Sequence, residues 1–230
     1  FDWNDESMRS RMFIASARDP RFARTLIYNG ATFKGQPVQS YVGGRNGRPL
    51  DGATPTSYYL RKHIVEATSF VTGSEMSYQH IFPFFRYAEV LLNYAEALAA
   101  ATQNPDFTGM KGEVEYTLSP REALNAVRAR YNMPGITETD YAAFVKRLRN
   151  ERRVELAFEG HRFWDIRRWK IGAETTKVYG LTITPQNDGS FSYMRSVIQQ
   201  RGWEDRMNFY PIADAELFKN HNLVQNDGWK

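Results

Sequence analysis

The residues of this chain that could do chemistry gather in one stretch, Arg149–Trp169, which reads RNERRVELAFEGHRFWDIRRW. Arginines alternate there with carboxylates, phenylalanines and tryptophans. Arginines interleaved with aromatic rings are typical of nucleic-acid surfaces, where guanidinium groups contact phosphates and rings stack on bases. On a helix, the same residues could instead pair with one another. The spacing has to decide between these two interpretations.

Helical spacing favours pairing, because residues three or four positions apart share a helix face. The candidate pairs are Arg147 with Glu151, Arg152 with Glu155, Arg162 with Asp165, and Asp165 with Arg168. A phosphate-binding face leaves its arginines unpaired, so the spacing argues against nucleic acid as a partner. We predict a structural clamp of charged residues, to which Phe158, Phe163, Trp164 and Trp169 add apolar docking area. The clamp residues are Glu151, Arg152, Glu155, Arg162, Asp165 and Arg168.

Other kinds of catalytic chemistry find little support. The chain has no cysteine, and its four histidines show no metal-ligand spacing, so we predict neither a metal site nor a cofactor. No Gly-x-Ser-x-Gly elbow marks a serine nucleophile. Paired carboxylates across a cleft cannot be recognised from spacing, so a glycoside hydrolase stays open as an alternative. The acids of the clamp are poor candidates, because a neighbouring arginine keeps a carboxyl group ionised.

Composition is that of a globular protein of 230 residues, with 42% hydrophobic and 24% charged residues. The net charge of +4 is spread over interleaved acids and bases, which is typical of a solvated mixed surface. No apolar run approaches the roughly 20 residues that span a bilayer. Aromatic residues make up 14%, enough to enlarge a core or to form stacking platforms for sugars.

Three regions follow from the punctuation and periodicity of the sequence. Residues 1–81 are rich in glycine and proline and predict a loop-rich segment with short strands. Residues 82–172 predict a helical core, with helices from about 87 to 101, from 120 toward 134, from 139 or 140 to 160, and from 161 to 169. Residues 173–230 predict a tail of loops and short strands, with a strand at 179–185 and a turn at 187–189. The expected fold is mostly α, a tetratricopeptide-like helical array with irregular loops and short β elements.

Several blocks together resemble the SusD/RagB family. The stretch Arg149–Trp169 is similar to the family signature, and the other blocks fall in the family's order. These blocks are Asp19-Pro20-Arg21, Tyr58–Lys62, Arg86–Ala97, Ala123–Arg130, Tyr210-Pro211-Ile212 and Asn222–Trp229. The resemblance spans nearly all of the chain but only about the C-terminal half of a family member. It implies that an N-terminal half is absent, with its export signal, its lipidated cysteine and its early helices.

The resemblance implies a non-enzymatic protein of the outer membrane of Bacteroidetes. Such a surface-exposed lipoprotein captures glycans, or in some cases peptides or other nutrients, for a TonB-dependent transporter. The only membrane attachment expected is the N-terminal lipid anchor. Ligand sites in the family are built from variable loops, so no residue is transferred from the signature. Because a glycan site needs aromatic faces and planar polar groups, the candidates are Trp3, Tyr41, Arg45 and Asn46.

Overall fold

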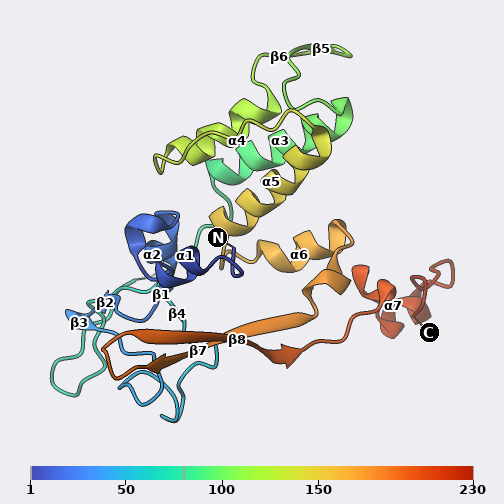
Figure 1. Ribbon diagram of the computed structural model, residues 1–230. Coiled ribbons are helices and arrows are strands. Elements are labelled where there is room, and N and C mark those ends of the chain that lie inside the picture. The colour runs from blue at the N-terminus through green and yellow to red at the C-terminus, as the bar shows by residue number, and fades with distance from the viewer. Residues whose placement is uncertain (1, 80, 230) are drawn as a thin grey trace. The chain divides into compact units, whose positions relative to one another are not determined.

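The computed structural model describes residues 2–79 and 81–229, so His80 lies outside the described residues. The chain divides into two compact units, each described here by itself (Figure 1). The first, called the helical unit, comprises Phe1–Val38 and Tyr59–Glu159. The second, called the hairpin unit, comprises Gln39–Tyr58 and Gly160–Lys230.

The helical unit is built on α3 (Tyr87–Thr102), α4 (Pro120–Ala129) and α5 (Tyr141–Glu155). The start of α4 is a capping box, because Ser119 and Glu122 each accept a hydrogen bond from the other's backbone N–H. The side chain of Asp140 caps α5 through the backbone N–H of Ala143. These local signals confirm the predicted beginnings of both helices.

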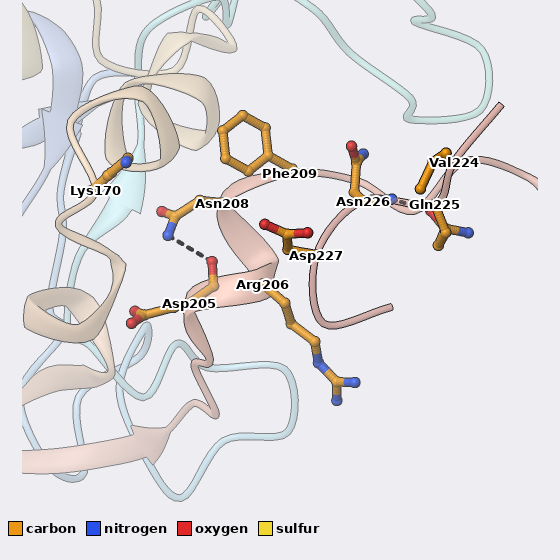
Figure 2. A pocket seen from close by; sticks show the side chains of 9 residues that line it. All are labelled: Lys170, Asp205, Arg206, Asn208, Phe209, Val224, Gln225, Asn226 and Asp227. Carbon is orange, nitrogen blue, oxygen red and sulfur yellow. Dashed lines mark hydrogen bonds between the residues drawn. The ribbon is translucent and has the colours of Figure 1, made fainter. Parts of the chain in front are cut away.

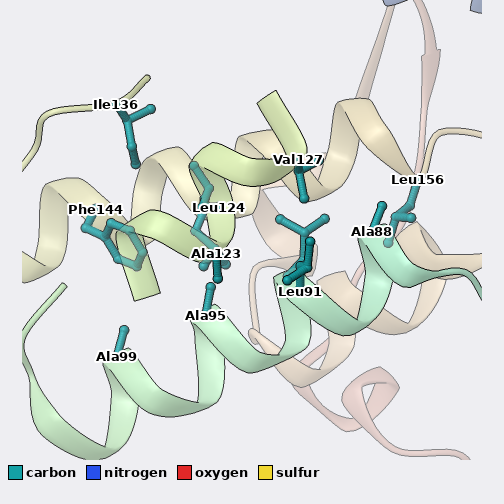
Figure 3. Close-up of a cluster of buried hydrophobic side chains, with 12 residues drawn as sticks. Ala88, Leu91, Ala95, Ala99, Ala123, Leu124, Val127, Ile136, Phe144 and Leu156 are labelled. Carbon is teal, nitrogen blue, oxygen red and sulfur yellow. The ribbon is translucent and has the colours of Figure 1, made fainter. Parts of the chain in front are cut away.

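Small residues let the three helices pack closely around one core (Figure 3). Ala88, Ala95 and Ala99 of α3 are almost fully buried, so the backbone of α4 can approach α3. Phe144 and Leu148 of α5 fill the space beside them, at 0% and 1% exposure. The remaining core residues are Leu91, Leu92, Ala123, Leu124, Val127, Ile136 and Leu156.

Short elements complete the helical unit. Before the core come α1 (Glu6–Ser10), a 3-10 turn at Ala15–Ala17 and α2 (Arg21–Thr25). The strands pair in antiparallel fashion: β1 (Leu26–Ile27) with β4 (Tyr59–Leu60), β2 (Thr32–Phe33) with β3 (Gln36–Pro37), and β5 (Gly109–Lys111) with β6 (Val114–Tyr116).

The hairpin unit is organised by a long antiparallel pair, β7 (Lys177–Pro185) and β8 (Phe191–Gln200). The loop 39–58 is hydrogen-bonded to β7. The Val42 N–H donates to the Ile183 carbonyl at 2.8 Å, and Ser57 Oγ donates to the Leu181 carbonyl at 2.6 Å. The other elements are α6 (His161–Arg168), the 3-10 helices at Gly172–Thr175 and Asp205–Asn208, and α7 (Asp214–Lys219).

Three details differ from the expected elements. The helix predicted to end near Gly160 ends at Glu155, because turns follow in which Phe158 and Gly160 both adopt positive φ. The helix predicted to run toward Pro134 ends at Ala129. The β elements of the tail are not short, since β7 and β8 have 9 and 10 residues. Helices with several two-stranded hairpins are therefore the observed architecture, and a tetratricopeptide-like array stays a prediction.

Candidate functional site

The conspicuous charged residues of the helical unit form a buried ion-pair network. Arg21, at 5% exposure, is its centre: Nη1 donates to Glu151 Oε1 at 2.6 Å and to Glu155 Oε2 at 2.8 Å. Its Nη2 donates to Asp19 Oδ2 at 2.6 Å. A second arginine, Arg86, donates from Nη1 to Glu155 Oε1 at 2.5 Å. Glu155 therefore bridges α2 and the residue that precedes α3.

Two further cations complete the network. Arg128 of α4 donates to Glu151 Oε2 at 2.7 Å, and Lys62 donates to Glu159 Oε1 at 2.5 Å. Arg86 also binds Glu159, from Nε to Oε2 at 2.8 Å. The network thus contains four carboxylates and four cations, counting Asp19, Glu151, Glu155 and Glu159 against Arg21, Lys62, Arg86 and Arg128. It is electrically balanced.

The structural role of the predicted clamp stays a prediction, and most of its predicted pairs have other partners. Arg147 pairs with Glu138 rather than with Glu151. Glu155 takes its arginines from outside α5, while Arg152 donates to Asn93 Oδ1 at 2.6 Å. The pair of Asp165 with Arg168, at 2.8 Å, is confirmed. The predicted pair of Arg162 with Asp165 stays a prediction.

Helix periodicity explains why the partners are distant ones. Phe144, Leu148, Glu151 and Glu155 are all buried and recur at steps of three and four residues. They therefore share the inward face of α5. Arg152 of the same helix is buried too, but it donates to Asn93. Buried carboxylates need full pairing, and arginines of neighbouring elements supply it.

Burial and pairing act in opposite directions on the network's acids. Burial raises the pKa of Glu159, but hydrogen bonds from Arg86 and Lys62 outweigh it and bring the pKa below the ordinary value of 4.5. For Asp19, burial again raises the pKa, but hydrogen bonds from Arg21 lower it by more, so that the pKa falls below the ordinary value of 3.8. A cavity of about 320 Å³ adjoins the network and is lined by Arg24 and by five network residues that already bind one another, Arg21, Lys62, Arg86, Glu155 and Glu159. Such mutual pairing is the arrangement that the prediction of a structural clamp expects.

Acid should therefore destabilise the helical unit. A depressed pKa in the folded state means that the unfolded chain binds more protons, so stability is present above the ordinary pKa and is lost as pH falls through the folded one. We expect a melting temperature that is level above about pH 5 and falls below it. Calorimetry across this range checks the profile. Glu159→Gln should be less stable at neutral pH and less sensitive to acid, and an unchanged acid slope in this variant would contradict the assignment.

A polar pocket of about 640 Å³ lies in the hairpin unit (Figure 2). Its lining comes from the residue that follows α6 by two positions, from the 3-10 helix at 205–208 and from the last residues of the chain. The lining residues are Lys170, Asp205, Arg206, Asn208, Phe209, Val224, Gln225, Asn226 and Asp227. Phe209 offers an aromatic ring that is 62% exposed. Planar polar groups around one exposed ring are what a sugar site requires.

The wall formed by the end of the chain is fastened through its own side chains. Asn226 Nδ2 donates to the carbonyl of Tyr210 at 2.5 Å. Gln225 accepts from Ile212 N–H at 2.7 Å and donates to the Ile212 carbonyl at 2.8 Å. Trp229 Nε1 donates to the carbonyls of Arg206 and Phe209, both at 3.1 Å. The closing motif seen in the sequence therefore attaches the wall of the pocket to residues 206–212.

The four predicted ligand residues are divided between the two units. Tyr41, Arg45 and Asn46 share the loop 39–58 of the hairpin unit, whereas Trp3 belongs to the helical unit. Tyr41 packs on Phe191 with ring centroids 5.2 Å apart. Asn46 Oδ1 accepts from Gln39 N–H at 3.1 Å and so stabilises the loop. Sequence reasoning missed the pocket residues, although their closing motif was visible as a block.

The aromatic residues of the signature only partly fulfil the predicted docking role. Trp169 is buried at 9% exposure, but Phe158, Phe163 and Trp164 are 52%, 40% and 57% exposed. Phe163 and Trp164 form a T-shaped pair at 5.1 Å, and Arg167 lies over the ring of Phe163 at 3.5 Å. This part of the signature is a surface of the hairpin unit.

Two expectations concern metals and membranes. Within residues 2–79 and 81–229, no group of three or more histidines or acids is arranged to hold a metal ion. None of the helices in these ranges is both long and apolar enough to cross a bilayer. The chain therefore combines a helical unit that contains a buried ion-pair network with a hairpin unit that contains a polar pocket.

Comparison with known proteins identifies the family. A model of the SusD family matches residues 6–229. The chain is 33% identical over 146 residues to the SusD-like protein P2 of Formosa agariphila, covering 62% of this chain and 24% of that protein. The chain belongs to the SusD family, which is a family of non-catalytic binding proteins.

Solved structures agree with this assignment. A SusD-like protein from Bacteroides fragilis matches with a TM-score of 0.74 and 29% identity, over 94% of this chain and 40% of that one. A SusD-like carbohydrate-binding protein from the same species matches with a TM-score of 0.69 and 29% identity, over 97% of this chain and 45% of that one. The chain therefore spans less than half the length of these relatives.

Proposed function

We propose that this chain belongs to a surface-exposed lipoprotein of the outer membrane that captures glycans and delivers them to a TonB-dependent transporter. Membership of the SusD family supports a binding role without catalysis. A relative with 29% identity over 97% of this chain is a carbohydrate-binding protein, which supports glycans as the ligand class. Within this proposal, α3, α4 and α5 belong to a tetratricopeptide-like array that serves as scaffold.

The observation that carries the proposal is the pocket of the hairpin unit. Glycan sites combine an aromatic face with polar groups that meet the hydroxyls in the plane of the sugar. Phe209 supplies the exposed ring, and Asp205, Asn208 and Asp227 supply polar groups around it. Tyr41 and Arg45 stay secondary candidates, as an aromatic and a cationic group on the loop 39–58, and Trp3 stays a candidate in the helical unit.

A polysaccharide panel tests the proposal. We expect the 230-residue chain to be retarded in native gels that contain at least one glycan, and to bind its oligosaccharides in calorimetry. Phe209→Ala should weaken that binding about fivefold or more, since loss of a ring contact costs about 1 kcal/mol. Phe218→Ala is the matched control, because Phe218 is 78% exposed on α7 and does not line the pocket.

Three outcomes would contradict the proposal. Release of reducing ends from the polysaccharides would favour a glycoside hydrolase. Binding of peptides but of no glycan would favour capture of another nutrient. Salt-dependent retention on DNA, together with no binding to glycans, would favour the nucleic-acid interpretation of the signature.

A further inference from the structure

A second cavity of the hairpin unit, of about 220 Å³, is lined by two arginines and by no acid. The two are Arg167 of α6 and Arg201, which follows the last residue of β8. Glu174 and Glu204 are neighbours in sequence of lining residues, but neither lines the cavity. The lining therefore carries two positive charges that no carboxylate of the lining offsets. We call it the arginine cavity.

The aromatic rings of the arginine cavity are held by close packing. Trp203 lies directly on Gly172, where an added Cβ would stand 1.9 Å from Cε2 of its ring, so only glycine fits there. The guanidinium of Arg167 lies 3.5 Å from the centroid of the Phe163 ring and 5.3 Å from that of the Trp203 ring. A guanidinium stacked on rings still presents its N–H groups in its own plane. The packing therefore fixes Arg167 without using up its donors.

Both guanidinium groups keep donors for a ligand. Arg167 Nη1 donates to the Phe163 carbonyl at 2.9 Å, and the backbone N–H of Arg201 donates to the Thr176 carbonyl at 2.8 Å. The Arg201 side chain makes a long hydrogen bond, from Nε to Gln199 Oε1 at 3.4 Å. Within residues 2–79 and 81–229, neither arginine forms an ion pair with a carboxylate. This distinguishes them from the arginines of the buried network, each of which binds at least one carboxylate.

From this geometry we infer that the arginine cavity is a subsite for the oxyanion of an acidic sugar residue, a carboxylate or a sulfate ester. The planar fork of an arginine binds such oxygens through two parallel N–H donors, and the rings of Phe163 and Trp203 offer apolar faces to the sugar. Pockets for drug-sized ligands measure about 300–1,000 Å³, so a cavity of about 220 Å³ suits a single sugar residue.

This inference rests on the proposed function and adds a second subsite to the polar pocket. The 3-10 helix at Asp205–Asn208 contributes to both cavities. Met207 lines the arginine cavity, whereas Arg206 and Asn208 line the polar pocket. The two cavities thus share one short helix, an arrangement that suits successive residues of one oligosaccharide.

Matched pairs of oligosaccharides test the inference on the 230-residue chain. Binding is measured by calorimetry at about 0.15 M salt, which screens exposed charges beyond about 8 Å. The first pair is oligogalacturonate and its neutral methyl ester, and the second is dextran sulfate and dextran. We expect the charged member of at least one pair to bind at least about tenfold more tightly than its neutral member. The pair that responds identifies carboxylate or sulfate as the ligand group.

Variants of Arg201 assign this preference to the cavity. Arg201→Ala should reduce it about tenfold and leave the affinity for the neutral member unchanged, because it removes charge-assisted hydrogen bonds. Arg201→Lys keeps the charge without the fork and should be intermediate. Arg195→Ala is the matched control, since Arg195 is an exposed arginine of β8 that stacks on Tyr179 and does not line the cavity. It should leave the preference unchanged.

Three results would overturn the inference while glycan capture stands. The first is that neither charged oligosaccharide binds more tightly than its neutral counterpart. The second is a loss in Arg201→Ala no larger than that in Arg195→Ala, and the third is tighter binding of single-stranded DNA than of either charged oligosaccharide. Absence of binding to the entire polysaccharide panel would instead overturn the proposed function.

Discussion

Replacing Glu155 by alanine is expected to lower the melting temperature of the helical unit by about 10 °C. The side chain of Glu155 is 1% exposed and accepts from Arg21 at 2.8 Å and from Arg86 at 2.5 Å. Its removal leaves two arginines without their shared carboxylate in a buried place, which typically costs about 3–5 kcal/mol. For chains of this size, 1 kcal/mol corresponds to about 2–4 °C, and scanning calorimetry measures the shift.

Two controls separate the loss of the network from the loss of an arbitrary ion pair. Arg147→Ala removes the pair with Glu138, in which Arg147 is 59% exposed, and should change stability by less than about 1 kcal/mol. Glu155→Gln keeps the shape but not the charge, and should be intermediate between Glu155→Ala and the unmodified chain.

Glycan affinity should stay near normal in Glu155→Ala below its melting temperature. The residues that line the proposed pocket all belong to the hairpin unit, whereas Glu155 belongs to the helical unit. An unchanged melting temperature together with lost glycan binding would show that the network is a ligand site and not a structural element.

The sequence was sufficient to predict what local interactions determine. Ser119, Glu122 and Asp140 act on backbone groups within three residues of themselves, so the beginnings of α4 and α5 follow from the chain alone. Gly160 was expected to end the helix before it, but α5 ends at Glu155, and Gly160, with a φ of 83°, is instead the residue that precedes α6. The turn at 187–189 joins β7 to β8, although the length of the hairpin was not foreseen.

Partners distant in the sequence were beyond local reasoning. Arg21 and Glu155 are 134 positions apart, and only the tertiary fold of the helical unit brings them together. A signal was nevertheless present, since Glu151 and Glu155 continue the inward stripe begun by Phe144 and Leu148. A carboxylate on an apolar stripe indicates a buried partner from another element. Such a stripe points to long-range pairing before i,i+4 pairing is considered.

The proposed ligand pocket was harder still to predict. Lys170, Asn208 and Asp227 come from three separate segments, and no periodicity links them. They meet because Gln225 and Asn226 attach the end of the chain to residues 210–212. Asn46 was predicted as a ligand residue from its residue type alone. Its side chain accepts a hydrogen bond from the backbone of its own loop, which residue type could not show.

The second large effect is expected from Phe144→Ala, which should destabilise the helical unit by about 3–5 kcal/mol. Phe144 is fully buried where α5 packs into the cluster of Figure 3, beside residues of α3 and α4. Alanine would leave a cavity among side chains that collapse only partly, so the loss of packing adds to the lost transfer free energy. Chemical denaturation checks it through a lower transition midpoint at an unchanged slope.

Phe84→Ala is the matched control for this cavity, since it deletes the same atoms at a position that is 93% exposed in the same unit. Its effect should stay within about 0.5 kcal/mol. A comparison with Glu155→Ala then distinguishes the two forces that hold α5 in place. The loss of unfolding free energy caused by Glu155→Ala should become smaller in acid, because protonation weakens the network in the unmodified chain too. The loss caused by Phe144→Ala should be independent of pH. Equal pH dependence of the two losses would mean that the ion pairs contribute little beyond the apolar core.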